Sequence, residues 1–205
     1  MKVAIIGTGN VGKSLYKGFS NAGCEVRFGS RHPEKPETAK AMPQKEAAKW
    51  GDIIVFAVPY SAIPETVKNI GKEAFKGKIV VDVTNVLNQN WELALGFTTS
   101  GAEELAKQIP EAKVVKAFNT VFAEHQGKGK IDGESLALFV AGDDAGAKNV
   151  LMDLGKKIGF EPVDAGPLKS ARYLEPMGVM IIGMAFGAQK MGSRIGYRLV
   201  KGKQN

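Results

Sequence analysis

A glycine-rich turn near the start of the chain is the feature that most limits how this sequence can fold. Residues 2–6 form a short apolar run with the pattern of a strand, and a Gly-x-Gly-x-x-Gly pattern follows at residues 7–12. Residues 13–22 then have the pattern of a helix, and residues 25–28 that of a second strand. A strand, turn, helix and second strand in this order predict the first unit of a parallel sheet.

The three glycines have distinct expected roles. Gly7 permits a tight turn, Gly9 lets the backbone approach a pyrophosphate, and Gly12 lets the helix pack closely on the strand. The backbone N–H groups at the start of the helix then face the phosphates, because that end of a helix carries partial positive charge. In this context the pattern predicts a dinucleotide site, and the alternative is a glycine-rich turn without a ligand.

The end of the second strand predicts which dinucleotide is bound. An NAD site has a carboxylate here to accept from the ribose 2′-hydroxyl, whereas this chain has Gly29 followed by Ser30 and Arg31. A guanidinium can bind a 2′-phosphate through two hydrogen bonds, the Ser30 hydroxyl can donate to it, and Lys35 adds positive charge. These residues predict NADP(H), and the alternative is a solvated basic turn.

Apolar runs and helical patterns alternate along the rest of the chain. We expect strands at residues 52–58, 78–83, 113–118, 136–141 and 160–163, and helices at residues 44–50, 64–70, 101–108 and 145–158. Apolar strands separated by helices indicate a parallel sheet covered on both faces. The expected fold is therefore α/β, a Rossmann-type doubly wound, mostly parallel sheet. Residues 84–100 and 126–133 are expected to be loops.

Residues 173–191 differ from the earlier helices because they are apolar on every side. Such a helix must be buried all round, and Gly178, Gly183 and Gly187 would let another backbone approach it closely. We expect residues 1–168 to form an NADP-binding domain and residues 169–205 to form a helical segment packed on it, at the interface of a homodimer. The alternative is burial of the helix within one chain.

Charge and composition narrow the class of protein. The 205 residues carry a net charge of +7, and the segment from Lys169 onward holds seven basic residues and one acid. This segment is either a solvated tail or a region that attracts an anionic ligand. Only Tyr173, Phe186 and Tyr197 are aromatic among these charges, which is not the interleaving of a stacking platform, so no nucleic-acid partner is expected.

Cysteine and hydropathy patterns exclude further classes. Cys24 is the only cysteine, which leaves no disulfide framework and no cysteine-based metal site, and we expect no metal. The chain has no pattern of a signal peptide and no stretch of the ~20 apolar residues that a membrane helix needs. These observations predict a cytoplasmic protein with no membrane partner.

Ligands of doubly wound sheets bind outside the carboxyl ends of the strands. Those ends carry Val58-Pro59-Tyr60, Thr84-Asn85, Asn119-Thr120 and Gly142-Asp143-Asp144. Pro59 and Tyr60 are expected to flank the cofactor, and Asn119 to contact the nicotinamide or the hydride acceptor. The alternative for each is a turn residue without a ligand.

The chain lacks an obvious general acid or base, which reduction of a carbonyl would need. His32 lies beside the expected 2′-phosphate site, and His125, although it follows Asn119 closely enough to approach the site, is expected at the surface. Hydride transfer between two redox coenzymes needs neither group, because the protein has only to hold two rings face to face. No catalytic residue is therefore assigned.

Several motifs together resemble those of a known family. They are Gly7-Thr8-Gly9-Asn10-Val11-Gly12, Gly29-Ser30-Arg31 with Lys35, Val58-Pro59-Tyr60, and Asp164-Ala165-Gly166-Pro167-Leu168 with Arg172 and Glu175. They are similar to motifs of the NADPH-dependent reductases of the deazaflavin coenzyme F-420 (F420), and the cytosolic domain of the STEAP-type metalloreductases, which pass hydride to a flavin, is similar in fold. The resemblance covers essentially the whole chain.

The resemblance implies a Rossmann domain with a small C-terminal helical part, a homodimer, and direct hydride transfer between NADP(H) and the deazaflavin. It implies that the pyrophosphate is held by Thr8, Gly9, Asn10 and Val11, the 2′-phosphate by Ser30, Arg31 and Lys35, and the nicotinamide half by Val58, Pro59, Tyr60, Asn119 and Ala123. The chain departs from the family at Asn119-Thr120, where the characterised deazaflavin reductases have a His-Thr pair. A different acceptor pocket is therefore expected.

The expected function is that of an oxidoreductase that moves hydride between NADP(H) and a deazaflavin, coenzyme F420, or a flavin. One alternative is NADPH-dependent reduction of another small substrate, such as an imine or a ketone, which the lack of an obvious acid disfavours. The other is a non-catalytic NADP(H)-binding redox sensor, which stoichiometric binding without turnover would indicate.

Overall fold

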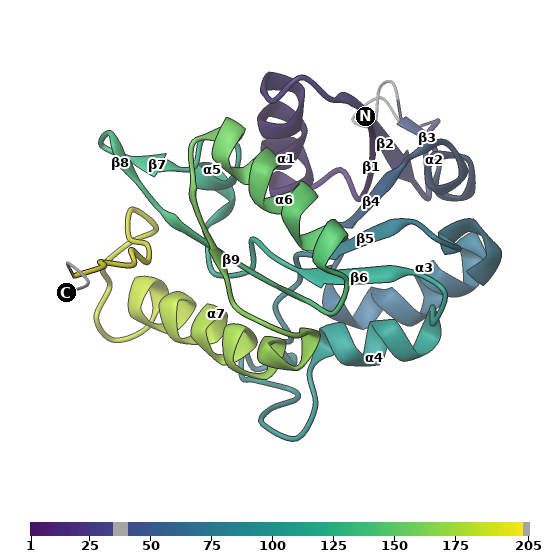
Figure 1. Ribbon diagram of the computed structural model, residues 1–205. Coiled ribbons are helices and arrows are strands. Elements are labelled where there is room, and N and C mark those ends of the chain that lie inside the picture. Colours follow the sequence, from purple (N-terminus) through teal and green to yellow (C-terminus); the bar gives the residue numbers. More distant parts are fainter. Residues whose placement is uncertain (35–40, 203–205) are drawn as a thin grey trace.

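The computed structural model describes residues 1–34 and 41–202 of the chain. In this part, eight strands form one sheet in the order β10-β9-β6-β5-β4-β1-β2-β3 (Figure 1). In chain order they are β1 Lys2–Ile6, β2 Glu25–Ser30, β3 Ala41–Pro43, β4 Ile53–Phe56, β5 Ile79–Asp82, β6 Lys113–Lys116, β9 Ala137–Gly142 and β10 Glu161–Asp164. All neighbours are parallel except β6 and β9, where Val115 lies opposite Gly142 in an antiparallel pair. The expected mostly parallel, doubly wound sheet is confirmed.

Helices cover both faces of the sheet, and each face has its own apolar core (Figure 1). The helices are α1 Asn10–Asn21, α2 Gln44–Trp50, α3 Ile63–Ile70, α4 Gly101–Gln108, α5 Ala123–Gln126, α6 Ala145–Ile158 and α7 Ala171–Phe186. On one face α1 and α6 bury Phe19 and Leu151, and on the other α2, α3 and α4 bury Ala47, Val67 and Leu105. Burial of both faces explains why the central strands are apolar throughout.

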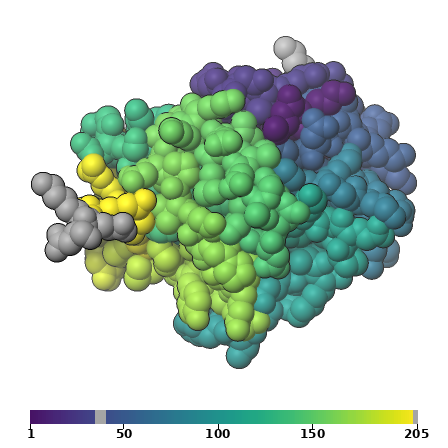
Figure 2. Space-filling model, viewed as in Figure 1, coloured from purple at the N-terminus to yellow at the C-terminus, as the bar shows by residue number. Residues whose placement is uncertain are grey.

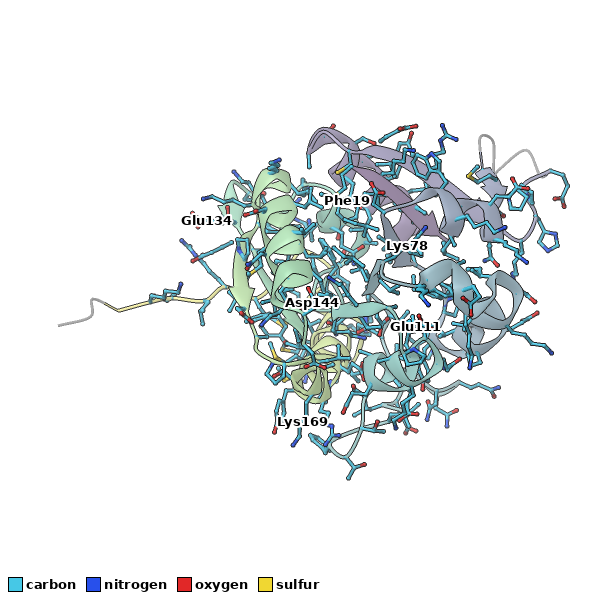
Figure 3. The ribbon with its side chains drawn as sticks, turned by 45° about the vertical axis from the view of Figure 1, so that its right-hand side comes forward. Phe19, Lys78, Glu111, Glu134, Asp144 and Lys169 are labelled. Carbon is cyan, nitrogen blue, oxygen red and sulfur yellow. The ribbon has the colours of Figure 1, made fainter. Side chains whose placement is uncertain are left out.

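Local hydrogen bonds set the ends of several helices. The Ser100 hydroxyl accepts from the backbone N–H of Glu103 at the start of α4, and Asp144 Oδ1 accepts from the N–H of Ala147 at the start of α6. At the end of α2, Lys78 Nζ donates to the carbonyls of Ala48 and Lys49, both at 2.7 Å. Figure 3 marks Phe19, Lys78 and Asp144 among the side chains. Such caps satisfy backbone groups that a helix leaves unpaired.

The predicted elements agree closely with the structure where the signal is local. Helices α2, α4 and α6 have the expected bounds, and α3 begins one residue earlier than expected. The expected strand at 52–58 is shorter, because pairing ends at Phe56 before the chain turns at Pro59.

Two pairings in the main sheet and one separate hairpin were not predicted. Strand β3 pairs with β2, β9 pairs with β6 in antiparallel register, and a hairpin of β7 Lys130–Ile131 and β8 Glu134–Ser135 occupies part of the region expected to be a loop. The loop prediction for 126–133 was wrong in that part. Asp132 and Gly133 form the hairpin turn with φ values of 50° and 88°, the left-handed conformation that an Asp-Gly turn provides.

Helix α7 differs from its prediction in extent and in burial. It ends at Phe186, and within this chain only one face is buried, by Leu174, Gly178, Ile181 and Ala185. Tyr173, Met180 and Phe186 are exposed, so the alternative of complete burial within one chain is wrong, and burial at a dimer interface stays a prediction. The surfaces of α6 and α7 lie on the same face of the molecule (Figure 2). No helix in the described ranges is long and apolar enough to span a membrane.

Candidate functional site

Two adjoining cavities form a groove across the carboxyl ends of β1, β2, β4 and β5. Each has a volume of about 290 Å³, and both are lined by Gly9, Ala57, Val58 and Pro59. One cavity continues to Gly7, Thr8, Ser30 and Arg31, and the other continues to Asn10, Val11, Val83, Thr84 and Asn85. We call these two cavities together the strand-end groove. The fold thus gathers most of the residues that the sequence predicted for cofactor binding.

The glycine-rich turn forms the floor of the groove, and each glycine has a separate geometric reason. Gly7 has a φ of +122°, and a Cβ on it would lie 2.2 Å from the Ala57 carbonyl oxygen. A Cβ on Gly12 would lie 2.2 Å from the Gly7 carbonyl oxygen. A Cβ on Gly9 would meet no heavy atom within 4 Å, so this position borders open space in the groove. These are the turn, packing and approach roles expected of the pattern.

The start of α1 is well suited to an anion. Gly9 is the N-cap residue, no side chain in the described part of the chain caps the helix, and the first turn has no acidic residue. The first N–H groups of a helix have no partner within the helix, and they carry partial positive charge. A pyrophosphate beside Gly9 would therefore fit this end of the groove.

The far end of the groove has the residues expected at a 2′-phosphate. A Cβ on Gly29 would lie 2.8 Å from Ile6 Cδ1 and 2.9 Å from Ala47 Cβ, so packing excludes a carboxylate side chain there. The Arg31 side chain is 56% exposed, and its Nη1 lies 3.9 Å from Glu65 Oε2, which leaves the guanidinium able to bind an anion. Ser30 Oγ accepts from the backbone N–H of His32 at 3.0 Å. Lys35 lies outside the described residues.

The opposite end of the groove contains a polar atom without a partner. Thr84 Oγ1 is buried and forms no hydrogen bond with any residue that the structure describes. Thr84 lines the groove beside Asn85 at the end of β5. A buried hydroxyl of this kind is costly unless a ligand or water binds it. Thr84 is a candidate site residue that was not among the predicted cofactor-binding residues, although the Thr84-Asn85 strand end was noted as a place where ligands bind.

Tyr60, Asn119 and Ala123 do not line the strand-end groove. Tyr60 packs against the start of α4, because a Cβ on Gly101 would lie 3.0 Å from Tyr60 Cε2. Burial raises the pKa of the Tyr60 hydroxyl, and the charges of Glu175, Glu104 and Asp82 raise it further. The structure therefore places Tyr60 beside acidic side chains rather than in the groove.

Asn119 is only 4% exposed and connects the end of β6 to α7. Its Nδ2 donates to the Leu174 carbonyl at 2.7 Å and to Asn85 Oδ1 at 3.3 Å. Its role as a contact of the nicotinamide or the acceptor stays a prediction. Ala123 begins α5 and lines a separate cavity that it shares with Asn10.

A buried ionic cluster lies beneath the groove and was not predicted. Lys116 Nζ donates to Asp82 Oδ2 at 2.9 Å and to the Thr84 carbonyl at 2.8 Å, and it lies 2.9 Å from Glu175 Oε1. Glu175 also accepts from the backbone N–H groups of Gly101 and Ala102 at the start of α4. The one available signal was a lysine inside the apolar run Val-Val-Lys-Ala-Phe.

The surroundings of Lys116 favour its charged form. Burial alone would lower the pKa of the Lys116 ammonium, but the adjacent carboxylates of Asp82 and Glu175 outweigh burial and raise it. The lysine is 0% exposed, and all three of its donors have partners. The cluster therefore joins β5, β6, α4 and α7 below the groove.

The three arginines of the basic C-terminal segment form ion pairs, and His125 is not at the surface. Arg172 forms a bidentate pair with Glu103, and Arg194 and Arg198 pair with acids of the β7–β8 hairpin region. His125 is 2% exposed, and its Nε2 lies 3.0 Å from the Ser193 carbonyl oxygen. The expected surface position of His125 was therefore wrong, because the segment after α7 folds back over α5.

The sheet order and the strand-end groove define a Rossmann-type α/β protein with a candidate dinucleotide site. Residues 2–86 match the family model described as NADP oxidoreductase coenzyme F420-dependent. The F420-dependent NADP reductase of Methanocaldococcus jannaschii is 30% identical, with 95% of this chain and 97% of that protein aligned. The chain therefore belongs to the family of F420-dependent NADP reductases.

Two further similarities show the range of proteins with this architecture. A crystal structure of a putative F420 dependent NADP-reductase from Arthrobacter superposes with a TM-score of 0.89 at 27% identity, covering 98% of this chain and 100% of that one. The metalloreductase STEAP3 of Rattus norvegicus is 33% identical over 88% of this chain, but the chain spans only 37% of that protein's length.

Proposed function

We propose that this protein transfers hydride between NADP(H) and a second ring coenzyme, the deazaflavin F420 or a flavin. The observation that carries the proposal is the strand-end groove, which runs from Arg31 past Gly9 to Thr84. The order of a cation, an uncapped helix start and an unpaired hydroxyl matches the order of 2′-phosphate, pyrophosphate and nicotinamide carboxamide in NADP(H). Membership of the family supports the same donor.

The residues of the chain would bind and orient the cofactor. Arg31 and Ser30 would hold the 2′-phosphate, and the backbone from Gly7 to Gly12 would hold the pyrophosphate. Val58 and Pro59 would form the wall along the nicotinamide half. Thr84 Oγ1 would bond to the carboxamide. NADPH supplies the hydride when it is bound, and the protein contributes position and exclusion of water.

The groove favours a ring coenzyme over a carbonyl substrate. Arg31 and His32 are the titratable side chains among the described residues that line it, and both lie at the 2′-phosphate end. A ketone or imine would need a proton donor near the nicotinamide end. Hydride exchange between two ring coenzymes needs no acid from the protein at that position.

The proposal is tested by NADPH oxidation with purified protein, with F420, FMN and FAD offered separately and NADH as the control donor. Turnover with F420 or a flavin supports the proposal and identifies the acceptor. Tight NADPH binding without turnover of any of the three would contradict it and would favour the redox-sensor alternative.

The 2′-phosphate assignment has its own test. Arg31→Glu places a negative charge where the phosphate would lie, so we expect at least about a tenfold loss of NADPH affinity and little change for NADH. The two dissociation constants are measured by fluorescence titration. Lys72→Glu, an exposed lysine near the end of α3, makes the same charge change away from the groove. An unchanged preference for NADPH in Arg31→Glu would refute the assignment.

We also propose that the protein is a homodimer that pairs through α7. The outer face of the helix carries Tyr173, Met177, Met180 and Met184 at helical spacing, and Tyr173 and Met180 are exposed. An apolar stripe along a whole helix is expected to be covered in solution. Gly183 lies on the exposed surface, with no heavy atom within 4 Å of the position of a Cβ, so a second backbone could approach there.

A further inference from the structure

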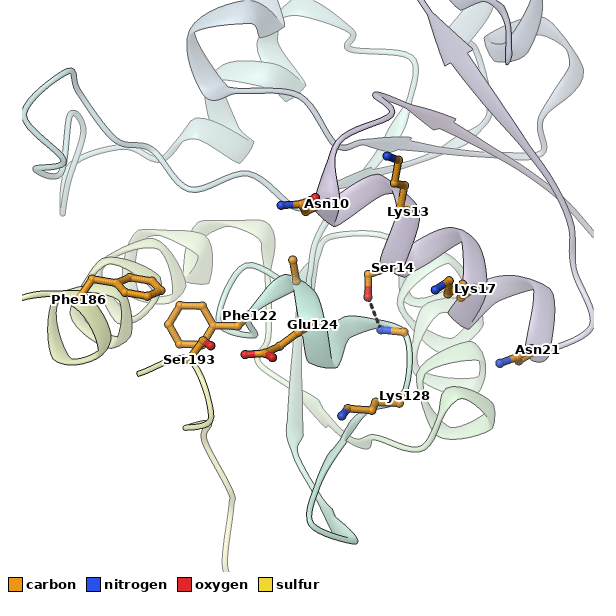
Figure 4. A pocket seen from close by; sticks show the side chains of 12 residues that line it. Asn10, Lys13, Ser14, Lys17, Asn21, Phe122, Glu124, Lys128, Phe186 and Ser193 are labelled. Carbon is orange, nitrogen blue, oxygen red and sulfur yellow. Dashed lines mark hydrogen bonds between the residues drawn. The ribbon is translucent and has the colours of Figure 1, made fainter. Parts of the chain in front are cut away.

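Two amide side chains line the end of the strand-end groove that contains Thr84, and only one of them has a fixed orientation. Asn10 begins α1 and is exposed (Figure 4), and its side chain forms no hydrogen bond with any residue in the described ranges. Asn85 follows β5 and is half-buried, and its side chain is bonded to Asn119. The orientation of the Asn85 amide decides whether the groove wall offers a hydrogen-bond donor or an acceptor at this point.

A backbone carbonyl of α7 sets that orientation through two hydrogen bonds in series. The Leu174 carbonyl oxygen can only accept, so Asn119 must turn its Nδ2 toward it, and this bond is 2.7 Å long. The same Nδ2 donates to Asn85 Oδ1 at 3.3 Å. Because the oxygen of Asn85 is bonded to Asn119, its Nδ2 is left without a partner among the residues that the structure describes. We call the Leu174 carbonyl, Asn119 and Asn85 the amide relay.

Helix α7 leaves room for the amide relay at a glycine. A Cβ on Gly178 would lie 2.3 Å from Asn85 Oδ1 and 2.8 Å from Asn119 Nδ2. Real Cβ atoms do not approach other heavy atoms so closely, so a side chain at this position would displace both amides. Gly178 is buried on the inner face of α7. The packing of this helix therefore holds Asn85 and Asn119 together.

The backbone of the strand end is held from below by the buried ionic cluster. The Thr84 N–H donates to Asp82 Oδ1 at 2.9 Å, and the Thr84 carbonyl accepts from Lys116 at 2.8 Å. The side chains of Asp82 and Lys116 are both 0% exposed. Thr84 and Asn85 therefore offer a ligand two polar side-chain groups on a backbone that is fixed by hydrogen bonds.

We propose that Asn119 is a positioning residue, which fixes Asn85 as a hydrogen-bond donor toward the nicotinamide carboxamide. A carboxamide has one acceptor, its oxygen, and one donor group, its NH₂. Asn85 Nδ2 would donate to that oxygen, and Thr84 Oγ1 would accept from the NH₂ group. Asn119 acts through Asn85 and does not itself touch the cofactor. The inference rests on the proposed function, because it takes the nicotinamide to lie beside Thr84.

The test compares two cofactors that differ only in the group that Asn85 would bind. The carboxamide of NADP⁺ can turn over and offer either its oxygen or its NH₂ group, whereas the ketone of the 3-acetylpyridine analogue of NADP⁺ offers an oxygen only. The dissociation constant of the analogue divided by that of NADP⁺ therefore reports whether the groove presents a donor. Binding of 2′,5′-ADP, which lacks the pyridine ring, measures the adenosine half alone. All three are titrated without a hydride acceptor.

Two variants reverse the polarity at different points of the amide relay. Asn85→Asp replaces the donor in the groove by an acceptor. Asn119→Asp leaves Asn85 unchanged but faces it with an acceptor, because the Leu174 carbonyl takes any proton that the acid carries. Asn85 then turns its Nδ2 toward position 119 and its oxygen toward the groove. Asn69→Asp, at an exposed position near the end of α3, is the matched control.

We expect the ratio of dissociation constants to rise at least about tenfold above the wild-type value in both relay variants, and to stay at that value in Asn69→Asp. The affinity for 2′,5′-ADP should stay within about twofold of the wild type, whereas a merely structural role of Asn119 would change it together with that for NADP⁺. Asn119→Ala, which leaves Asn85 free to turn, should give a ratio between those of the wild type and Asn119→Asp. Thermal melts check that each variant folds.

Four results would overturn the inference. They are a wild-type ratio in Asn85→Asp, a wild-type ratio in Asn119→Asp, an equal rise in Asn69→Asp, and a parallel loss of NADP⁺ and 2′,5′-ADP binding at an unchanged ratio. If Asn119→Asp does not fold, a wild-type ratio in Asn119→Ala overturns it instead.

Failure of this inference is distinguishable from failure of the proposed function. NADPH turnover with F420 or a flavin, together with an unchanged ratio in the relay variants, would keep the function and overturn the role of Asn119. A shifted ratio in a protein that turns over none of these acceptors would support the amide relay and contradict hydride transfer.

Discussion

At the scale of single residues, a buried hydroxyl without a hydrogen-bond partner distinguishes the groove from the rest of the interior. Most polar side chains buried in this chain have partners, as the three hydrogen-bonding contacts of Lys116 illustrate. Thr84 Oγ1 is an exception, and it lies on the wall where the nicotinamide half is proposed. An orphaned buried hydroxyl destabilises the free protein and becomes favourable only when a ligand or water bonds to it.

Thr84→Val tests this reasoning, because valine has nearly the same shape as threonine without the hydroxyl. We expect unchanged or slightly higher thermal stability of the free protein, and NADPH binding weaker by about 1–2 kcal/mol through loss of one hydrogen bond. Calorimetric melting and titration with NADPH give the two quantities. Weaker stability with unchanged NADPH affinity would show that Thr84 has a structural role only.

At the scale of elements, two charged side chains of α7, Arg172 and Glu175, attach this helix to the start of α4. Glu175 bonds to the first backbone N–H groups of α4, and Arg172 pairs with Glu103 through bonds of 2.9 and 2.8 Å. The pKa of the Glu103 carboxyl lies below its ordinary value, and the hydrogen bond from Arg172 is the largest cause. Burial acts in the opposite direction, but it is outweighed by this bond together with the bond from Ser100 and the nearby positive charges. The pair therefore stabilises α7 only while Glu103 is ionised.

This pairing predicts a pH-dependent effect of Arg172→Gln. A lowered carboxyl pKa contributes stability above the ordinary glutamate value of about 4.3, and that contribution is lost as pH falls through the lowered value. We expect a loss of about 1 kcal/mol at neutral pH, or a decrease in Tm of roughly 2–4 °C, and a smaller difference from wild type below about pH 4.

The measurement is thermal melting of both proteins across that pH range. Arg194→Gln, which breaks an ion pair exposed on both sides, should change stability by less than about 0.5 kcal/mol at any pH. A difference between Arg172→Gln and wild type that is the same at acid and neutral pH would contradict the role of Glu103.

At the scale of the whole molecule, the exposed apolar face of α7 predicts that two copies of the chain pair through this helix. Met180 is 53% exposed in the middle of the stripe formed with Tyr173, Met177 and Met184. Met180→Arg should disrupt a dimer, because the charge would lie inside an apolar interface. Light scattering should give a mass near twice the 21.9 kDa chain for the wild type and near 21.9 kDa for the variant.

Val200→Arg changes an exposed apolar residue outside the helix and should leave the dimer intact. A monomeric wild type, or a dimer that Met180→Arg does not weaken, would refute pairing through α7. The division into a domain at residues 1–168 and a helical segment from residue 169 stays a prediction.

Short-range patterns determined a large part of this protein without reference to the fold. The first strand, the glycine turn, α1 and β2 follow from residues close together in the chain, and so do the bounds of α2, α4 and α6. The replacement of an acid by Gly29-Ser30-Arg31 was also readable, because its position is set by β2 alone. Hydrophobic periodicity and turn chemistry act over a few residues, so the sequence displays them directly.

The tertiary structure decided what depends on contacts between distant residues. Glu175 meets Gly101 across 74 positions, Lys116 meets Asp82 across 34, and Asn119 bonds to Leu174 across 55. The antiparallel pairing of β9 and the buried face of α7 depend on the same packing. A lysine in an apolar run can lie at the surface or form a buried ion pair. Only the side chains that pack around it determine which of the two occurs.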